Sequence, residues 1–443
     1  MSAAVPALTK AGKPKRLSES RRVLDNGLTV IAVRKPGVPL VELRLRVPFF
    51  STKATHAALA NVLSETVLTG TAEYDRVGLA RAVQALGGDL GVGVDADRLV
   101  FSGSVLATNF PKLLAILADV LTGATYPKHE VLAERDRLIE RLGIARSRAQ
   151  VVAAEALAHR LWPGHPYSRE LPQLDEVRDV TAPKIRKLAH DAVRPEGGIV
   201  VVVGDIAPNR AIDAVAAALS GWTGKSKLTK AVPVPGPQFG PLRLVDRPGS
   251  VQSSVRFGGP ALRRDDPRFA ALQLANLVFG GYFSSRWNEN IREDKGYTYG
   301  AHSRIEHNVL GSTLTLEADV ATEVTAPALL ETGYELGRLA SLPITEAELA
   351  SARQYAIGTL ALSTATQAGL ASTLSGLAAG GLDVGWIAAH PGRLQRVTVD
   401  EVTAVSAEFF APSGLVAVVV GDAEQIAGSL RRLGPLDVTA PEA

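Results

Sequence analysis

The chain has 443 residues, of which 46% are apolar and 21% are charged, and its formal net charge is +3. This length predicts at least two large units with cores of their own, and so small a charge does not imply a nucleic-acid or anionic-membrane surface. The sequence contains no cysteine. Disulfides, thiolate metal ligands and cysteine nucleophiles are therefore excluded, and any metal would need histidine or carboxylate ligands.

Residues 1–22 are predicted to form a flexible basic arm, because charged runs near a terminus are usually solvated. The arm lacks the apolar run of about seven or more residues that a secretory signal needs. We therefore expect a cytoplasmic protein, and a periplasmic one stays open if the N-terminus is incomplete. The Ala/Gly-rich stretch 363–381 contains Ser, Thr and Gln, so we do not expect it to span a membrane.

Residues 23–221 are predicted to form a first α/β half. Asn26 and Gly27 supply the backbone angles of a tight hairpin turn. Apolar and charged residues alternate from Val41 to Val47, as in a strand with one buried face. A further strand is expected at 99–106, and helices at about 56–68, 113–121 and 128–148.

A duplicated segment predicts a second half of the same plan over residues 242–443. The sequence Val-Val-Val-Gly-Asp occurs at 201–205 and again at 418–422, each time after a helix that begins at Val-Thr. The Pro- and Lys-rich segment 222–241 is predicted to be an extended linker. The expected fold class is α+β, with two homologous halves, each a mostly antiparallel sheet with helices packed on one face.

The most informative segment runs from Gly280 to Gly300 and holds Arg292 and Tyr299 seven residues apart. Together they offer a planar guanidinium with several N–H donors and a phenol O–H donor, which can bind and polarise a peptide carbonyl. The alternative is a helix-end arginine and a strand tyrosine packed by their own neighbours. The pattern GG-x-x-S-S-R followed by R-E-x-x-G-x-x-Y closely resembles the C-terminal half-site of the pitrilysin/insulinase family of zinc peptidases.

The resemblance also implies where a metal site would lie. The family holds zinc with an H-x-x-E-H motif on a helix of its catalytic half. The pair Gly70-Thr71 fixes the register, and the ligand and base positions are then filled by Asn61, Ser64 and Glu65, with Arg141 at the third ligand position. No metal is therefore expected in this chain. Glu65 and Arg141 could pair with each other or remain solvated.

A second grouping, His302, Glu306 and His307, superficially resembles a metal motif. It lies in a segment of strand character, and an odd separation places the two histidines on opposite faces. We therefore do not expect it to bind a metal.

The resemblance implies a processing-peptidase-like fold and a non-catalytic, substrate-binding subunit of a heterodimeric zinc metallopeptidase. A homologous partner would carry H-x-x-E-H and the zinc, Arg292 and Tyr299 would act in trans, and peptides would be the substrates. Two alternatives are a non-enzymatic scaffold of the same family and a stand-alone enzyme with improvised ligands. Substrate contacts are expected at Gly280, Gly281, Phe283 and Ser284.

Overall fold

The computed structural model describes residues 17–169, 171–229 and 231–440. The first half is built on one sheet, in which β2 runs parallel to β6 and the other neighbouring strands are antiparallel. The sheet has the order β1-β2-β6-β3-β5-β4, where the strands are β1 (Ser18–Val23), β2 (Thr29–Arg34), β3 (Leu40–Pro48), β4 (Asp89–Val94), β5 (Arg98–Leu106) and β6 (Ile199–Gly204).

The second half is built on a sheet of the same plan, and the neighbouring strands pair in the same sense except at one edge. There the edge strand β12 runs parallel to β7, whereas the edge strand β1 of the first sheet runs antiparallel to β2. The expected class, two α/β halves with mostly antiparallel sheets, is confirmed. The order is β12-β7-β11-β8-β10-β9, where the strands are β7 (Leu242–Asp246), β8 (Gln252–Ala261), β9 (Thr298–His307), β10 (Ser312–Ala321), β11 (Val416–Gly421) and β12 (Leu436–Thr439).

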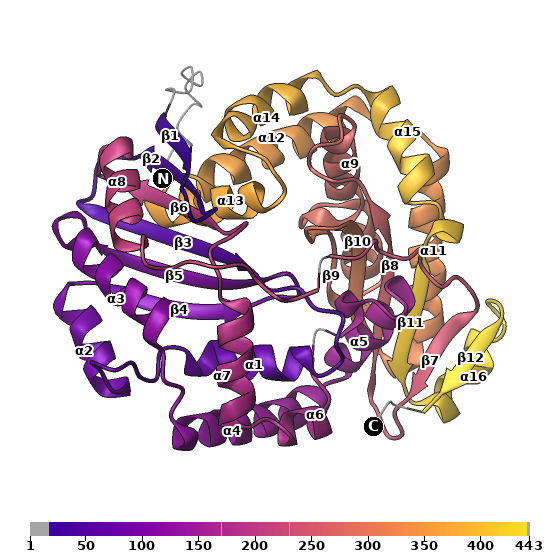
Figure 1. Cartoon of the computed structure of the whole chain (residues 1–443). Coiled ribbons are helices and arrows are strands. Elements are labelled where there is room, and N and C mark those ends of the chain that lie inside the picture. The colour runs from indigo at the N-terminus through magenta and orange to yellow at the C-terminus, as the bar shows by residue number, and fades with distance from the viewer. Residues whose placement is uncertain (1–16, 170, 230, 441–443) are drawn as a thin grey trace, which may run out of the picture.

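Helices cover the outer face of each sheet and bury a large apolar core against it (Figure 1). Within the described residues, none of them combines the length and apolar character of a bilayer span. The first half contains α1 (His56–Thr66), α2 (Arg76–Ala85), α3 (Phe110–Gly123), α4 (Lys128–Arg146), α5 (Ala149–Leu161), α6 (Leu174–Arg178), α7 (Ala182–Ala192) and α8 (Pro208–Ala218). The second half contains α9 (Phe269–Asn276), α10 (Arg286–Asn288), α11 (Thr325–Ser341), α12 (Glu346–Ser363), α13 (Gln367–Ala379), α14 (Val384–Arg396), α15 (Val399–Phe409) and α16 (Ala423–Leu430).

Short 3₁₀ and π-helical turns connect several of these elements. They are η1 (Ala107–Asn109), η2 (Pro166–Ser168), η5 (Thr322–Val324) and η6 (Pro412–Gly414), which are 3₁₀ turns, and η3 (Leu277–Gly281) and η4 (Glu289–Asp294), which are π-helical turns.

Each half also lends one helix to the inner face of the other half's sheet. Helix α5 packs on β8 and β11, and α13 packs on β3 and β6 (Figure 1). Both helices are rich in alanine and other small residues, which allow a helix to lie close to a sheet. This exchange was not expected from the sequence. It explains the Ala/Gly-rich stretch 363–381, which becomes an inter-half helix.

The duplication is also visible in the strand register. Arg44 lies opposite Val201 in the first sheet, and Arg256 lies opposite Val418 in the second, where the two valines are equivalent in the repeated sequence. Arg44 pairs with Glu42 at 3.1 Å, and Arg256 pairs with Asp319 at 3.4 Å. The two halves therefore share most of their topology and an arginine at equivalent positions, which is partly buried in the first half and buried in the second.

The predicted flexible arm is wrong for its last residues, because Ser18–Val23 form β1. This strand pairs with β2 through a turn in which Gly27 has a φ of 82°. It is mostly exposed, as is common for polar edge strands, and so it shows no buried face in the sequence. Residues 1–16 lie outside the described residues.

No helix or strand occurs in the described part of the predicted linker, residues 222–241.

Candidate functional site

The positions on α1 that correspond to the family's metal motif carry side chains already engaged within the helix. Asn61 donates from Nδ2 to the Ala57 carbonyl oxygen at 2.9 Å, and Ser64 donates from Oγ to the Asn61 carbonyl oxygen at 2.8 Å. An amide and a hydroxyl are not the imidazole or carboxylate ligands that zinc prefers. These two positions therefore do not fit a zinc ion.

Glu65 and Arg141 form an ion pair between α1 and α4. Arg141 Nη2 lies 3.3 Å from Glu65 Oε1, and about half of each side chain is exposed, 50% and 47% respectively. The paired alternative is therefore the one found, and a guanidinium lies at the position that the resemblance assigns to the third metal ligand. Across the described ranges, no group of three or more histidine and carboxylate side chains is placed to hold a metal ion.

The His302 and His307 grouping is divided between the two faces of β9, as expected. His302 is exposed, whereas His307 packs edge to face on Phe269 with ring centroids 5.4 Å apart. Burial, with smaller contributions from Arg264 and Arg263, lowers the pKa of His307 to about 3. These histidines do not converge on a common ligand position.

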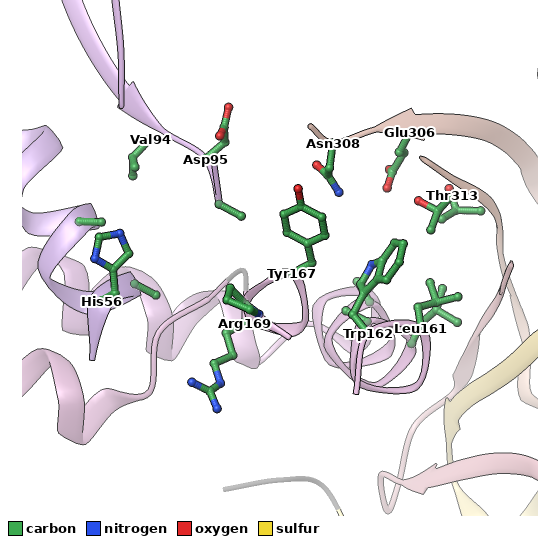
Figure 2. Close-up of a pocket in the computed structure, with 18 of the residues that line it drawn as sticks. His56, Val94, Asp95, Leu161, Trp162, Tyr167, Arg169, Glu306, Asn308 and Thr313 are labelled. Carbon is green, nitrogen blue, oxygen red and sulfur yellow. The ribbon is translucent and has the colours of Figure 1, made fainter. Parts of the chain in front are cut away.

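A cavity of about 320 Å³ lies between the two halves beside α1. Figure 2 shows His56, Trp162 and Tyr167 of the first half facing Glu306 and Thr313 of the second half. Asp95, which follows the edge strand β4, also lines the cavity. The space next to the altered metal positions is therefore enclosed by both halves.

A buried polar junction holds the halves together at this cavity. The phenol oxygen of Tyr167 lies 2.8 and 2.9 Å from the two carboxylate oxygens of Asp97. Val309 donates its backbone N–H to Asp97 at 2.9 Å, and Leu310 donates to the Tyr167 oxygen at 3.1 Å. Burial raises the pKa of Asp97, although these hydrogen bonds oppose the shift. The β9–β10 hairpin is thus fixed to the first half.

Arg292 lies in the π-helical turn η4, close to Phe283. The guanidinium carbon stands 4.2 Å from the centroid of the Phe283 ring, a distance typical of a cation–π contact. Its Nη1 is 3.0 Å from Glu293 Oε1, but within the described residues this nitrogen makes no hydrogen bond. The guanidinium is therefore positioned by an aromatic face, with hydrogen-bonding capacity left over.

Tyr299 is 97% exposed although it lies in β9, the edge strand of the second sheet. Its phenol has no hydrogen-bond partner in the described part of the chain. The alternative of a tyrosine packed by its own neighbours therefore does not describe this residue. The phenol is available to a group from outside the chain.

The glycine pair before this segment permits close contacts within the chain. A Cβ on Gly280 would lie 3.0 Å from both Ser303 and Trp287, and one on Gly281 would lie 2.8 Å from Asn276. Phe283 and Ser284, in contrast, are exposed. Substrate contact at these four positions remains a prediction.

Two residues that sequence reasoning did not single out hold the segment in place. Arg286 makes a two-point ion pair with Glu348. Asn288 donates to the Ala301 carbonyl oxygen at 2.7 Å and accepts from the Ala301 N–H at 3.1 Å. Arg286 is the arginine of the GG-x-x-S-S-R pattern, so this pattern could have identified it from the sequence.

Two family profiles match the chain. One, described as Insulinase (Peptidase family M16), matches residues 29–173, and the other, described as Peptidase M16 inactive domain, matches residues 179–355. An uncharacterized zinc protease of Streptomyces coelicolor is 26% identical over 64% of this chain and 63% of its own length. An uncharacterized zinc protease of Mycobacterium bovis is 25% identical over 91% of this chain and 93% of its own length.

Two further similar proteins have names that contain the word inactive. A probable inactive metalloprotease of Bacillus subtilis is 24% identical over 43% of this chain and 45% of its own length. The crystal structure of a peptidase M16 inactive domain from Pseudomonas fluorescens superposes with a TM-score of 0.85 at 22% identity, covering 92% of this chain and 98% of that one. The chain therefore belongs to the M16 insulinase family and is similar to zinc proteases, while its described residues contain no group of side chains placed to hold a metal ion.

Proposed function

We propose that this chain is the non-catalytic, substrate-binding subunit of a heterodimeric zinc metallopeptidase. Arg292 and Tyr299 act in trans at the zinc site of a homologous partner that carries H-x-x-E-H. The observation that carries the proposal is Tyr299, a 97% exposed strand tyrosine without a hydrogen-bond partner in the described part of the chain. Since no group of side chains in the described residues is placed to hold a metal ion, the phenol is proposed to assist a metal held by the partner.

In this proposal the two side chains have different tasks. The Tyr299 phenol donates a hydrogen bond to the oxyanion that forms when the peptide carbonyl is attacked, and the Arg292 fork holds neighbouring substrate carbonyls. A preorganised donor of this kind typically lowers the barrier by about 3 kcal/mol. The partner supplies the zinc and the water that it activates.

A scaffold without enzymatic function is the competing proposal, and the name of the Bacillus relative favours it. The local structure favours the subunit instead. Tyr299 exposes its phenol at the surface, and the partly exposed Arg292 has a guanidinium nitrogen, Nη1, that makes no hydrogen bond within the described chain. A scaffold has no chemical need for both groups.

The test mixes this chain with a homologous chain that carries an intact H-x-x-E-H. Size-exclusion chromatography reports association, and a fluorogenic peptide reports cleavage. The proposal expects a one-to-one complex that cuts the peptide, with neither chain active alone. A complex whose cleavage rate equals that of the metal-bearing chain alone would support the scaffold.

A further inference from the structure

Arg264 is a cation without an internal partner. It lies in the loop between β8 and α9, and across the described ranges its guanidinium makes no hydrogen bond or ion pair; its backbone carbonyl accepts from Trp386 Nε1 at 3.1 Å. The adjacent Arg263, in contrast, pairs with Asp265 at 3.1 Å and donates to the Val309 carbonyl oxygen at 3.0 Å. Burial lowers the pKa of Arg264, yet a guanidinium stays charged in proteins. A half-buried cation of this kind is a suitable partner for an anion.

Arg264 lines two adjoining cavities. The larger, which we name the Arg264 cavity, has a volume of about 470 Å³ and lies between β9 and helices α12, α13 and α14. The smaller has a volume of about 300 Å³. The two share Arg264, His307, Gly376 and Leu377, so the unpaired guanidinium stands at their junction. Volumes of this size match those of ordinary ligand sites.

No aspartate or glutamate of the described chain lines the Arg264 cavity, whereas two arginines do. The second, Arg304, is already paired with Glu306 and Glu317, at 2.6 Å in each case. The acids of the smaller cavity are also engaged. Asp265 pairs with Arg263, Asp97 binds Tyr167, and Asp95 lies 3.6 Å from Arg46. A carboxylate partner for Arg264 would therefore have to come from outside the described chain.

Apart from its two arginines, the wall of the Arg264 cavity is aromatic, apolar or uncharged polar. His390 stacks on Trp386 and on Phe269, with ring centroids 4.2 and 5.8 Å away, and these two rings also contact each other at 6.3 Å. Burial, with Arg393 and Arg264, lowers the pKa of His390 to about 4, so this imidazole is neutral near pH 7, as is that of His307. Hydroxyl groups complete the wall, among them those of Thr359 and Ser372. Such a lining suits an organic carboxylate with an apolar side chain.

We propose that the Arg264 cavity binds the C-terminal carboxylate of a peptide. The choice of a peptide as the bearer of the carboxylate rests on the function proposed above. The cavity includes Ser303 to Ile305 of β9, the strand that carries Tyr299. Arg304 lies five positions after Tyr299 along the strand, which is roughly 17 Å at about 3.3 Å per residue. A bound carboxylate would thus place a peptide bond about five residues upstream near Tyr299.

The test uses the isolated full chain, so it does not depend on any partner or on cleavage. Isothermal titration calorimetry compares N-acetylated Ala-Ala-Ala-Ala-Phe with a free C-terminal carboxylate and the same peptide as a C-terminal amide. We expect the acid to bind about tenfold more tightly or better, because only the acid can form the charge-assisted pair. Equal affinities, or no binding by the acid, would overturn the proposal.

Substitutions at Arg264 test whether this residue binds the carboxylate, and inorganic phosphate tests whether the site takes an anion other than a peptide. Arg264→Gln should remove the preference for the acid, and Arg264→Lys should keep part of it. Arg268→Gln is the matched control, since Arg268 is already paired with Asp266 and Glu408, and it should bind like the wild type. An unchanged preference in Arg264→Gln contradicts the assignment. Inorganic phosphate that binds through Arg264 while the acid peptide does not would likewise rule out a peptide site.

Discussion

Arg286 and Glu348 form a two-point ion pair that ties the start of the Arg292 segment to helix α12. Nε of Arg286 lies 2.5 Å from Oε1 of Glu348, and Nη2 lies 2.9 Å from Oε2. Arg286 is only 8% exposed, and Glu348 also accepts the N–H of Thr345 at the beginning of α12. Arg292 follows within two turns, so this pair fixes the place from which its guanidinium extends.

Replacing Arg286 with methionine should destabilise the chain by about 2–3 kcal/mol. The value is below the roughly 3–5 kcal/mol for breaking a fully buried pair, because the Glu348 side chain keeps 26% of its surface exposed. Urea unfolding measures the loss. Arg263→Met, which breaks an exposed pair with Asp265, should cost about 1 kcal/mol or less. Equal costs for the two variants would contradict a special role for Arg286.

The same pair predicts a pH dependence. Burial raises the pKa of Glu348, but the hydrogen bonds from Arg286 and Thr345 outweigh it and lower the pKa from 4.5 to about 2. Since the folded-state pKa is depressed, the stabilisation is complete above about pH 4.5 and is lost as the pH falls toward 2. The free-energy difference between wild type and Glu348→Gln should therefore shrink over this interval. A free-energy difference that stays constant from about pH 7 to 3 would contradict this prediction. Glu346→Gln, at an exposed position of the same helix, is the control.

Local patterns allowed much of the fold to be predicted. The Asn26-Gly27 turn, the alternation in β3 and the duplicated valine strand each report on neighbouring residues, and each corresponds to an element of the structure. Most of strand β1 was assigned to the flexible arm, because its pairing with β2 leaves nearly all its side chains exposed. Without a buried face, a strand has no period-two signal.

Long-range relationships were not accessible from the sequence. The exchange of α5 and α13 between the halves depends on how the two sheets face each other, which no local pattern encodes. The Arg286–Glu348 pair joins residues 62 positions apart. The Arg263-Arg264-Asp265-Asp266 run suggests complete local pairing, yet in the described structure only Arg264 of these four remains without a partner.

The junction of Asp97 with Tyr167 should control how tightly the β9–β10 hairpin is held. Tyr167→Phe removes a donor to a buried carboxylate and an acceptor for the Leu310 N–H. Leaving these groups unpaired should cost about 1–3 kcal/mol. Hydrogen exchange at Val309 and Leu310 should accelerate, and Tyr334→Phe, at an exposed helical position, should leave it unchanged. Unaltered protection in Tyr167→Phe would show that the junction does not hold the hairpin.

A metal site should be recoverable from the altered positions on α1 and α4. The quadruple variant Asn61→His, Ser64→Glu, Glu65→His and Arg141→Glu supplies two histidines one turn apart with a carboxylate on the facing helix, a set that zinc prefers. The existing contact of 3.3 Å shows that positions 65 and 141 are within reach of each other. Metal analysis should find about one zinc per chain in this variant.

The matched control for the metal site keeps Arg141 and changes only the three α1 positions. Its guanidinium should oppose the cation, so this triple variant should bind zinc much more weakly. Equal zinc content in the triple and quadruple variants would show that Arg141 does not occupy a ligand position. Stoichiometric zinc in the wild-type chain would contradict the loss of the site.

The most direct measurement is kcat for peptide cleavage by the assembled heterodimer with Tyr299→Phe, compared with Tyr334→Phe as the exposed-tyrosine control. If Tyr299 donates to the oxyanion in trans, kcat should fall by about 10²–10³-fold while the control retains wild-type turnover. An unchanged kcat in the Tyr299→Phe complex would contradict the proposed division of labour between the two chains.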